Sequence, residues 1–188
     1  MEERALEILK TMFSRRGLPT ETERLNLDGV EGANIYQLGK IIVFFSQKAR
    51  GLLERDINTL IAAAKKAEYT NGIVLVTLLP PSENVLKAVK AYAKERVQLF
   101  HIRQLQFDIT THRYAVPHRI LKEDEKTAVL TKYKISKPED QLPWIDSQDP
   151  MVKWIGAVPG DVIEVIRHSD VAGRVPYYRY CVEDVNVA

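Results

Sequence analysis

A metal-dependent nuclease needs an acidic residue and an (Asp/Glu)-x-Lys triplet on neighbouring strands, because the carboxylates hold Mg²⁺ and the lysine positions water or stabilises charge. The sequence contains one such triplet, Asp124-Glu125-Lys126, and it stands at the start of a predicted helix. The two apolar runs that would have to carry the carboxylates, residues 40–46 (KIIVFFS) and 72–79 (GIVLVTLL), contain none. Solvated helix charges are therefore the expected role of the triplet, and a diverged Mg²⁺ nuclease is kept as an alternative.

Other patterns that carry chemistry are absent from the sequence. There is no Gly-x-Gly-x-x-Gly, phosphate-binding loop, His-Glu-x-x-His or Gly-x-Ser-x-Gly motif. The four histidines do not form an evident ligand cluster; His112 and His118 could approach each other across a bend, but surface or hydrogen-bonded histidines are the expected reading. The single cysteine, Cys181, rules out an internal disulfide and predicts a buried, unreactive thiol. We expect no catalytic residue, no cofactor and no metal.

The composition limits the class of protein. The chain has 188 residues, 45% of them hydrophobic and 28% charged, which suits one globular domain with a sizeable core or two small ones. A net charge of +2 does not by itself indicate nucleic-acid binding, so contact with a polyanion would need a local patch. No apolar run approaches the ~20 residues that span a bilayer, and the acidic, amphipathic N-terminus is unlike a signal peptide. We expect no membrane partner and a reducing compartment.

The pattern of residues 1–108 predicts an α/β domain. We expect the polar stretch 20–39 to be a loop with a short strand at 33–38. Ser82 follows two prolines and is a candidate N-cap. The periodicity predicts helices over residues 2–16, 52–69 and 82–95, and strands over 40–46, 72–79 and 97–102. The alternation of strand and helix implies parallel pairing with right-handed crossovers in a three-layer arrangement.

Residues 109–188 predict a second, small α+β domain. We expect extended segments before residue 121, a helix over 122–135, and an irregular stretch over 136–148. Asp149-Pro150 predicts the start of a short helix that Gly156 ends. Two antiparallel strands, 162–167 and 177–182, would be joined by a long polar loop. Strand alternation would place Tyr178 and Tyr180 on one face and Arg179 on the other, which favours core packing over base stacking.

The second domain resembles a known family. The segments DQLPWID, DPMVKWIG, PGDVIEVIRHSDVAGR and YYRYCV, in that order, resemble the fifth common subunit of the nuclear RNA polymerases and its archaeal counterpart. The residues that match the family pattern are His112, Val116, Pro117, His118, Tyr133, Gln141, Leu142, Pro143, Ile145, Asp149, Pro150, Gly156, Gly160, Val162, Arg167, Ser169, Ala172, Gly173, Tyr178 and Arg179. The sequence departs from the pattern at Trp144, Lys153, Trp154, His168, Asp170 and Val171.

The resemblance implies a non-catalytic subunit of a DNA-directed RNA polymerase, found in the nucleus. The archaeal protein is the small domain alone, which implies that residues 109–188 assemble on the largest subunit and other polymerase subunits. Residues 1–108 would be the N-terminal jaw of the eukaryotic form, which has a nuclease-like fold without an active site. A large DNA virus is a further implied source, with a viral factory or virion as the location. A freestanding adaptor that binds transcription factors remains an alternative.

Two sets of candidate contact residues follow from this resemblance. The partner-interface candidates are His118, Gln141, Arg167, Ser169, Gly173, Arg174 and Arg179. For Arg167, a partner contact and an intradomain pairing remain equally open, and Gly173 is first expected to satisfy a left-handed or crowded backbone. The resemblance also places the jaw beside downstream double-stranded DNA. The candidates there are Ser82, Lys87, Lys90 and Lys94, for which an ordinary solvated lysine face is the alternative.

Overall fold

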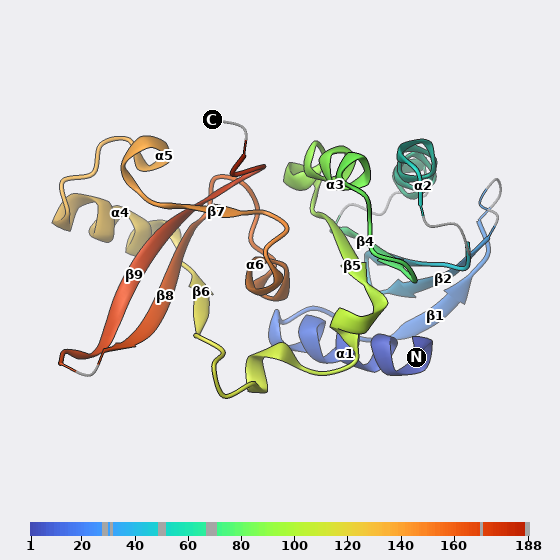
Figure 1. Ribbon diagram of the computed structural model, residues 1–188, viewed down its shortest axis with the longest axis horizontal. Helices are drawn as coiled ribbons and strands as arrows, with labels where there is room; N and C mark the ends of the chain where they lie inside the picture. Colours follow the sequence, from blue (N-terminus) through green and yellow to red (C-terminus); the bar gives the residue numbers. More distant parts are fainter. Residues whose placement is uncertain (28–29, 31, 49–51, 67–70, 170, 187–188) are drawn as a thin grey trace. The chain divides into compact units, whose positions relative to one another are not determined.

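The computed structural model describes residues 1–27, 30, 32–48, 52–66, 71–169 and 171–186. The chain forms two compact units, Met1–Asp108 and Ile109–Ala188 (Figure 1). In the described residues of either unit, no helix has the length and apolar character needed to cross a membrane.

The first unit is built on a mixed five-stranded sheet with the strand order β1-β2-β3-β4-β5. Strands β1 to β3 pair antiparallel, whereas β3, β4 and β5 pair in parallel, as the alternation of strand and helix predicted. The elements are α1 (Glu2–Arg15), β1 (Thr22–Leu25), β2 (Ala33–Leu38), β3 (Ile41–Ser46), α2 (Glu54–Lys66), β4 (Ile73–Thr77), α3 (Glu83–Lys90), the 3₁₀ helix η1 (Ala93–Glu95), β5 (Val97–His101) and the 3₁₀ helix η2 (Ile102–Leu105).

Both faces of this sheet are covered, which explains why its central strands are continuously apolar. Figure 1 shows α2 and α3 on one side of the sheet and α1 on the other. Ile42, Phe44 and alternate residues of β4 and β5 pack in one core with α2 and α3. On the opposite face, the side chain of Gln98 in β5 accepts a hydrogen bond from Arg16 at the end of α1 (3.2 Å). The result is a three-layer mixed α/β unit.

Two sequence expectations for this unit need correction, and a third cannot be compared because it lies outside the described residues. The stretch 20–39 contains β1 in addition to the predicted strand 33–38. The predicted end of helix 52–69 falls at residues 67–70, outside the described residues. Helix α3 ends at Lys90 rather than near Glu95. Good helix formers continue past Lys90, but Arg96 adopts a left-handed conformation (φ 59°) that turns the chain into β5, so tertiary structure overrides local propensity here.

The second unit contains a four-stranded sheet with the order β6-β8-β9-β7. Two short elements, α5 and β7, lie where the sequence predicted an irregular stretch. The elements are the 3₁₀ helix η3 (Ile109–Thr111), β6 (His118–Ile120), α4 (Glu123–Lys132), α5 (Pro138–Gln141), β7 (Trp144–Asp146), α6 (Pro150–Ile155), β8 (Val162–Ser169) and β9 (Gly173–Val182). The sheet has small cores on both faces. One contains Ile163, Val165 and Cys181, and the other contains Leu121, Leu142 and Val162.

Local signals in this unit are confirmed where they specify backbone geometry. The Asp149 carboxylate caps α6 by accepting hydrogen bonds from the backbone N–H groups of Met151 (2.8 Å) and Val152 (3.3 Å). Pro150 occupies the first turn of α6, and Gly156 ends it with φ 76°. Cys181 is fully buried, and burial raises the pKa of its thiol to about 12, so the thiol is unreactive as expected.

The predicted long polar loop is instead a β-ribbon. Strand β8 continues to Ser169 and β9 starts at Gly173, and the register pairs Arg167 with Val175 and His168 with Arg174. The strands are held together by backbone hydrogen bonds, so polar side chains do not prevent the pairing from continuing. The range expected to be a loop is therefore a hairpin, and its tip is short.

Two prolines explain why this ribbon is only two strands wide. Pro117 and Pro143 directly precede β6 and β7. Each accepts one hydrogen bond through its carbonyl, from the backbone N–H of Ile166 (3.0 Å) and of Tyr180 (2.9 Å) respectively. Because proline has no N–H to donate in return, the β6 ladder ends at the level of Ile166 and the β7 ladder near Tyr180. The paired ends of β8 and β9 extend beyond β6 and β7 (Figure 1).

Candidate functional site

We call the projecting end of the ribbon, residues 167–169 and 171–177, the arm. Successive residues of a strand point to opposite faces, so the register assigns each side chain to a face. Arg167, Val175 and Tyr177 share the face of Val165, whereas His168 and Arg174 lie on the face of Val162. At the tip, Val171 is 98% exposed. The arm therefore presents side chains to solvent on both faces and at its end.

Two arginines of the arm are candidates for contact with a partner. The Arg167 guanidinium lies 4.9 Å from the centre of the Tyr177 ring, which is 48% exposed. This cation–π contact orients the guanidinium and leaves its N–H donors at the surface. Arg174 is exposed, and no hydrogen bond or ion pair joins its side chain to another described residue. For Arg167 the structure shows an intradomain contact that does not use up its donors.

The other predicted interface residues of this unit make bonds within it. Arg179 donates through Nη1 to the carbonyl of Trp144 (2.9 Å). Gln141 accepts through Oε1 from the backbone N–H groups of Ser136 (2.8 Å) and Lys137 (2.9 Å), which closes the turn before α5. Each of these side chains therefore has a structural role in the unit.

The same holds for three residues closer to the arm or in it. His118 Nδ1 lies 2.6 Å from the carbonyl of Val116. Ser169 accepts through Oγ from the backbone N–H of Ala172 (3.3 Å) across the hairpin turn. Gly173 has φ +69°, and a Cβ added there would meet nothing within 4 Å, so the backbone angle rather than crowding favours glycine.

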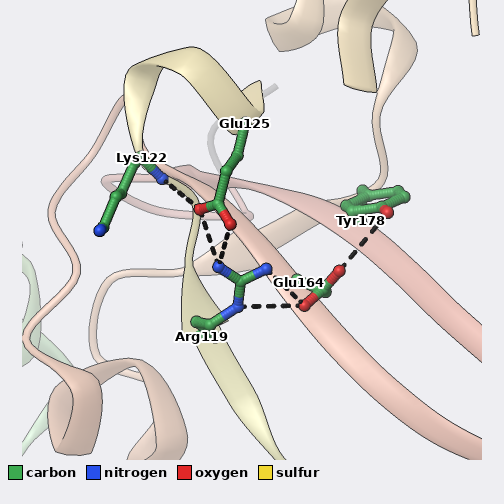
Figure 2. Close-up of polar contacts among 5 residues, drawn as sticks. All are labelled: Arg119, Lys122, Glu125, Glu164 and Tyr178. Atoms are coloured by element: carbon green, nitrogen blue, oxygen red, sulfur yellow. Dashed lines mark hydrogen bonds and ion pairs between the residues drawn. The ribbon is translucent and has the colours of Figure 1, made fainter. Parts of the chain in front are cut away.

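Sequence reasoning missed a cluster of charged residues centred on Arg119, which Figure 2 shows. Arg119 in β6 donates to both carboxylate oxygens of Glu125 in α4 (2.6 and 2.7 Å) and to Oε2 of Glu164 in β8 (2.9 Å). Glu125 also accepts from the backbone N–H of Lys122 at the start of α4 (3.0 Å), and the Tyr178 hydroxyl lies 3.5 Å from Glu164 Oε1. The cluster ties four elements together.

Hydrogen bonds and burial shift the pKa values of three residues in this cluster. The hydrogen bonds from Arg119 and from the Lys122 N–H lower the pKa of Glu125. The bonds to Glu125 and Glu164 raise the pKa of Arg119. Burial, followed by the charge of Glu164, raises the pKa of Tyr178. No local pattern marks this cluster, because Arg119 and Glu164 lie 45 residues apart.

The cluster also gives the Asp124-Glu125-Lys126 triplet a structural role. Glu125 is held by Arg119, and Lys126 pairs with Glu123 (3.3 Å) on the surface of α4. Within the part of the chain that the structure describes, no three His, Cys, Asp or Glu side chains gather where they could hold a metal ion. The nuclease alternative therefore finds no support.

The predicted DNA-proximal residues lie on α3, at its start and on η1. Ser82 is the N-cap of α3 by backbone geometry, but its side chain makes no capping bond. Lys87 and Lys90 lie three residues apart on α3 and so share a side of the helix. Lys94 belongs to η1 and not to α3, because α3 is shorter than the predicted helix 82–95. A hollow lined by Leu53, Glu54, Arg55, Ser82, Asn84 and Val85 lies beside the start of α3.

These features define a class of protein: a mixed α/β protein of two units, in which the charged side chains described above serve structure or face solvent. The comparisons give the family. The sequence model described as RNA polymerase Rpb5, C-terminal domain, matches residues 107–181. The DNA-directed RNA polymerase subunit Rpo5 of Pyrococcus horikoshii is 52% identical over 79 residues, which cover 42% of this chain and 94% of that protein. The corresponding subunit of Methanosarcina mazei is 45% identical over 78 residues, 42% of this chain and 97% of that protein.

A eukaryotic relative extends the similarity. The subunit rpabc1 of the DNA-directed RNA polymerases I, II and III of Dictyostelium discoideum is 30% identical over 145 residues, which cover 76% of this chain and 72% of that protein. The chain belongs to the Rpb5 family of DNA-directed RNA polymerase subunits, and the resemblance seen in its sequence is confirmed. It is a component of that complex and not an enzyme on its own. The alternative of a freestanding adaptor finds no support.

Proposed function

We propose that the second unit anchors the chain on the largest subunit of the polymerase, and that the first unit is a jaw close to downstream duplex DNA. The observation that carries the first part is the length of the archaeal relatives. Their match covers 94% of the Pyrococcus protein but only 42% of this chain, and the family model falls almost wholly within Ile109–Ala188. A polypeptide made of the second unit alone thus serves as a polymerase subunit, which favours an anchoring role for this unit.

The test is co-purification. A tagged full-length chain expressed in its source organism is expected to bring down the other polymerase subunits in stoichiometric amounts, at salt concentrations that remove bound nucleic acid. Recovery of the chain as a monomer, or with one transcription factor and no polymerase, would contradict the proposal and favour the adaptor. The Dictyostelium relative supports the nucleus as the location, and fluorescence of the tagged chain in cells tests it.

The jaw role rests on the Dictyostelium match and on charge. The 145 aligned residues are more than the second unit contains, so the match extends into the first unit. There, the exposed Lys87 and partly buried Lys90 offer a sequence-independent contact with phosphates. Glu83 already lies in the first turn of α3, where it compensates the helix dipole. For this reason we place the DNA contact on the lysine side of α3 rather than at its N-terminus beside Ser82.

Charge reversal tests the DNA contact. The double variant Lys87→Glu/Lys90→Glu is expected to shorten the lifetime of elongation complexes and to reduce its dependence on salt, because each neutralised phosphate contributes a slope of about −0.9. Lys10→Glu on α1, which covers the other face of the sheet, is the matched control. Equal lifetimes and salt slopes in the double variant and the control would show that Lys87 and Lys90 are ordinary solvated lysines. Transcription factors that contact the first unit would be found in the same purified complexes.

A further inference from the structure

The arm has a property that the anchoring role alone does not explain: its two available cations lie on opposite faces. The register pairs Arg167 with Val175 and His168 with Arg174, so Arg167 and Arg174 point in opposite directions from the plane of the ribbon. A flat partner surface that contacts one face leaves the other in solvent. A single planar interface therefore engages only one of these two arginines.

The apolar groups of the arm are divided in the same way. Tyr177 and Val175 lie on the face of Arg167. Pro176 is exposed on the other side, with Arg174, and Val171 is almost wholly exposed at the tip. Exposed aromatic and arginine side chains are typical of the buried centres of protein interfaces. Both faces and the tip thus carry groups that a protein partner can bury.

The backbone of β9 hinders the addition of a strand along one edge of the arm. On the outer edge of β9, Pro176 stands in the position that faces away from β8, because its pairing partner Ile166 donates to Pro117 on the other side. Proline offers no N–H there, which weakens strand addition along this edge. The β9 edge of the arm is therefore less suited to partner contact than its faces and tip.

The charge of the arm indicates the chemistry of the partner. Among its described residues, the charged side chains are those of Arg167 and Arg174, with His168 beside them. The sequence adds one carboxylate, that of Asp170 between Ser169 and Val171, so the two arginines leave the arm with a net positive charge. The nearest carboxylate along β8, Glu164, is already bound by Arg119. Arginine binds carboxylates through paired N–H donors. With two arginines and several apolar groups, this surface fits an acidic protein cleft better than a nucleic-acid backbone.

We propose that the arm inserts into a cleft of a polymerase subunit, with acidic side chains on both walls and an apolar floor that receives Val171. This inference rests on the proposed anchoring function and specifies how the arm contacts the polymerase. Insertion buries Arg167 and Arg174 at the same time. The contact of Arg167 with the Tyr177 ring orients its guanidinium for pairing with a carboxylate of the partner.

Thiol protection in the purified complex tests the insertion directly. Three single variants of the full chain, Val175→Cys, His168→Cys and Val171→Cys, place a thiol on either face and at the tip. The native Cys181 is fully buried with a pKa of about 12 and gives no background. All three thiols are expected to react in the isolated chain and to be protected in the complex. Protection on one face only would overturn the insertion while leaving the anchoring role intact.

Charge reversal gives a second readout. Arg167→Glu and Arg174→Glu are each expected to weaken retention of the chain in the polymerase by about tenfold or more, as for charged pairs buried in interfaces. Lys132→Glu, an exposed lysine at the end of α4, is the matched control and is expected to bind normally. Wild-type retention of either arm variant would overturn the two-walled cleft. If protection of the thiols disappears after nuclease digestion of the complex, the arm binds nucleic acid and the proposal is wrong. Failure of the wild-type chain to co-purify would instead contradict the anchoring function itself.

Discussion

The carboxylate of Glu125 accepts hydrogen bonds from Arg119 Nη1 through both of its oxygens, at 2.6 and 2.7 Å, and this pair fixes the start of α4 on β6. Arg119 at the same time holds Glu164 of β8 (Figure 2). One guanidinium therefore joins a helix to two neighbouring strands of the sheet. Since the pair is half exposed, its attraction is partly screened by solvent and salt.

The pH dependence of stability should report this pair. Because the folded-state pKa of Glu125 lies below its usual value of about 4.3, its contribution to stability is present above that pH and is lost as the pH falls through the lower, folded-state value. Glu125→Gln is expected to be less stable than wild type in urea unfolding at pH 7, and the difference should shrink at pH 3. A constant difference across this range would show that the charge of Glu125 does not matter.

The salt dependence of the variant Arg119→Gln tests whether the charge of Arg119 contributes to stability. The variant removes the cation from both carboxylates, so its midpoint in urea is expected to fall at low salt and to approach wild type at high salt. Asp149→Ala provides the comparison, because it removes the N-cap of α6. The loss of a cap lowers stability by about 1 kcal/mol, and we expect this loss to depend much less on salt. Equal salt dependence of the two variants would contradict the role assigned to Arg119.

Two buried groups of the second unit should give stability slopes of opposite sign at alkaline pH. Burial lowers the pKa of Lys153 to about 8, so between pH 8 and its usual value of about 10.4 the unfolded chain holds more protons and stability rises with pH. Burial raises the pKa of Cys181 to about 12, so above its usual value of about 8.5 the unfolded chain loses the proton first and stability falls.

Single variants separate the contributions of Lys153 and Cys181 to the change of stability with pH. Between pH 8 and pH 10, Lys153→Met is expected to show a more negative change in unfolding free energy than wild type, and Cys181→Ala a more positive one. Met is similar in size to Lys, which limits the change in packing around the 4% exposed side chain. Parallel curves for wild type and Lys153→Met would mean that Lys153 titrates as it does in water.

The parts of the fold that could be predicted from the sequence are those with a local cause. Strands β3 and β4 are apolar along almost their whole length because both faces of their sheet are covered. The helix α6 has its cap, its first-turn proline and its final glycine within eight residues. Strands β1 and β7 gave no such signal. They are short edge strands of mixed composition, and their pairing partners define them.

The candidate site divides in the same way. The sequence predicted that arginines in the polar segment near its end contact a partner. It did not predict which of these arginines have side chains that are not held by bonds within the unit. That depends on contacts between distant residues, such as Arg179 with the carbonyl of Trp144, 35 residues away. The predicted helix 82–95 was too long for a related reason. Helix-forming residues continue past Lys90, but the chain leaves the α-helix there and passes through η1 into β5.

Gly173 offers a test of structure against interface at one position. With φ +69° and open space around an added Cβ, Gly173→Ala is expected to lower stability by about 1 kcal/mol through backbone strain alone, and Gly173→Asn by less, because asparagine tolerates this conformation better. Both variants should still enter the polymerase when folded. A loss of assembly without a loss of stability would instead give Gly173 a direct contact with the partner.

The division into two units leads to a final prediction about a shortened chain. Residues 109–188 contain their own cores on both faces of the second sheet, and the Rpo5 proteins, which match over 94% of the Pyrococcus chain, have about this length. A fragment of residues 109–188 is therefore expected to fold with a cooperative unfolding transition and to enter the polymerase in place of the full chain. The complexes it forms should lose the effect of Lys87 and Lys90 on the lifetime of elongation complexes while retaining thiol protection on the arm. If the fragment folds but cannot assemble, the first unit must share in anchoring, and the separation of an anchor from a jaw is wrong.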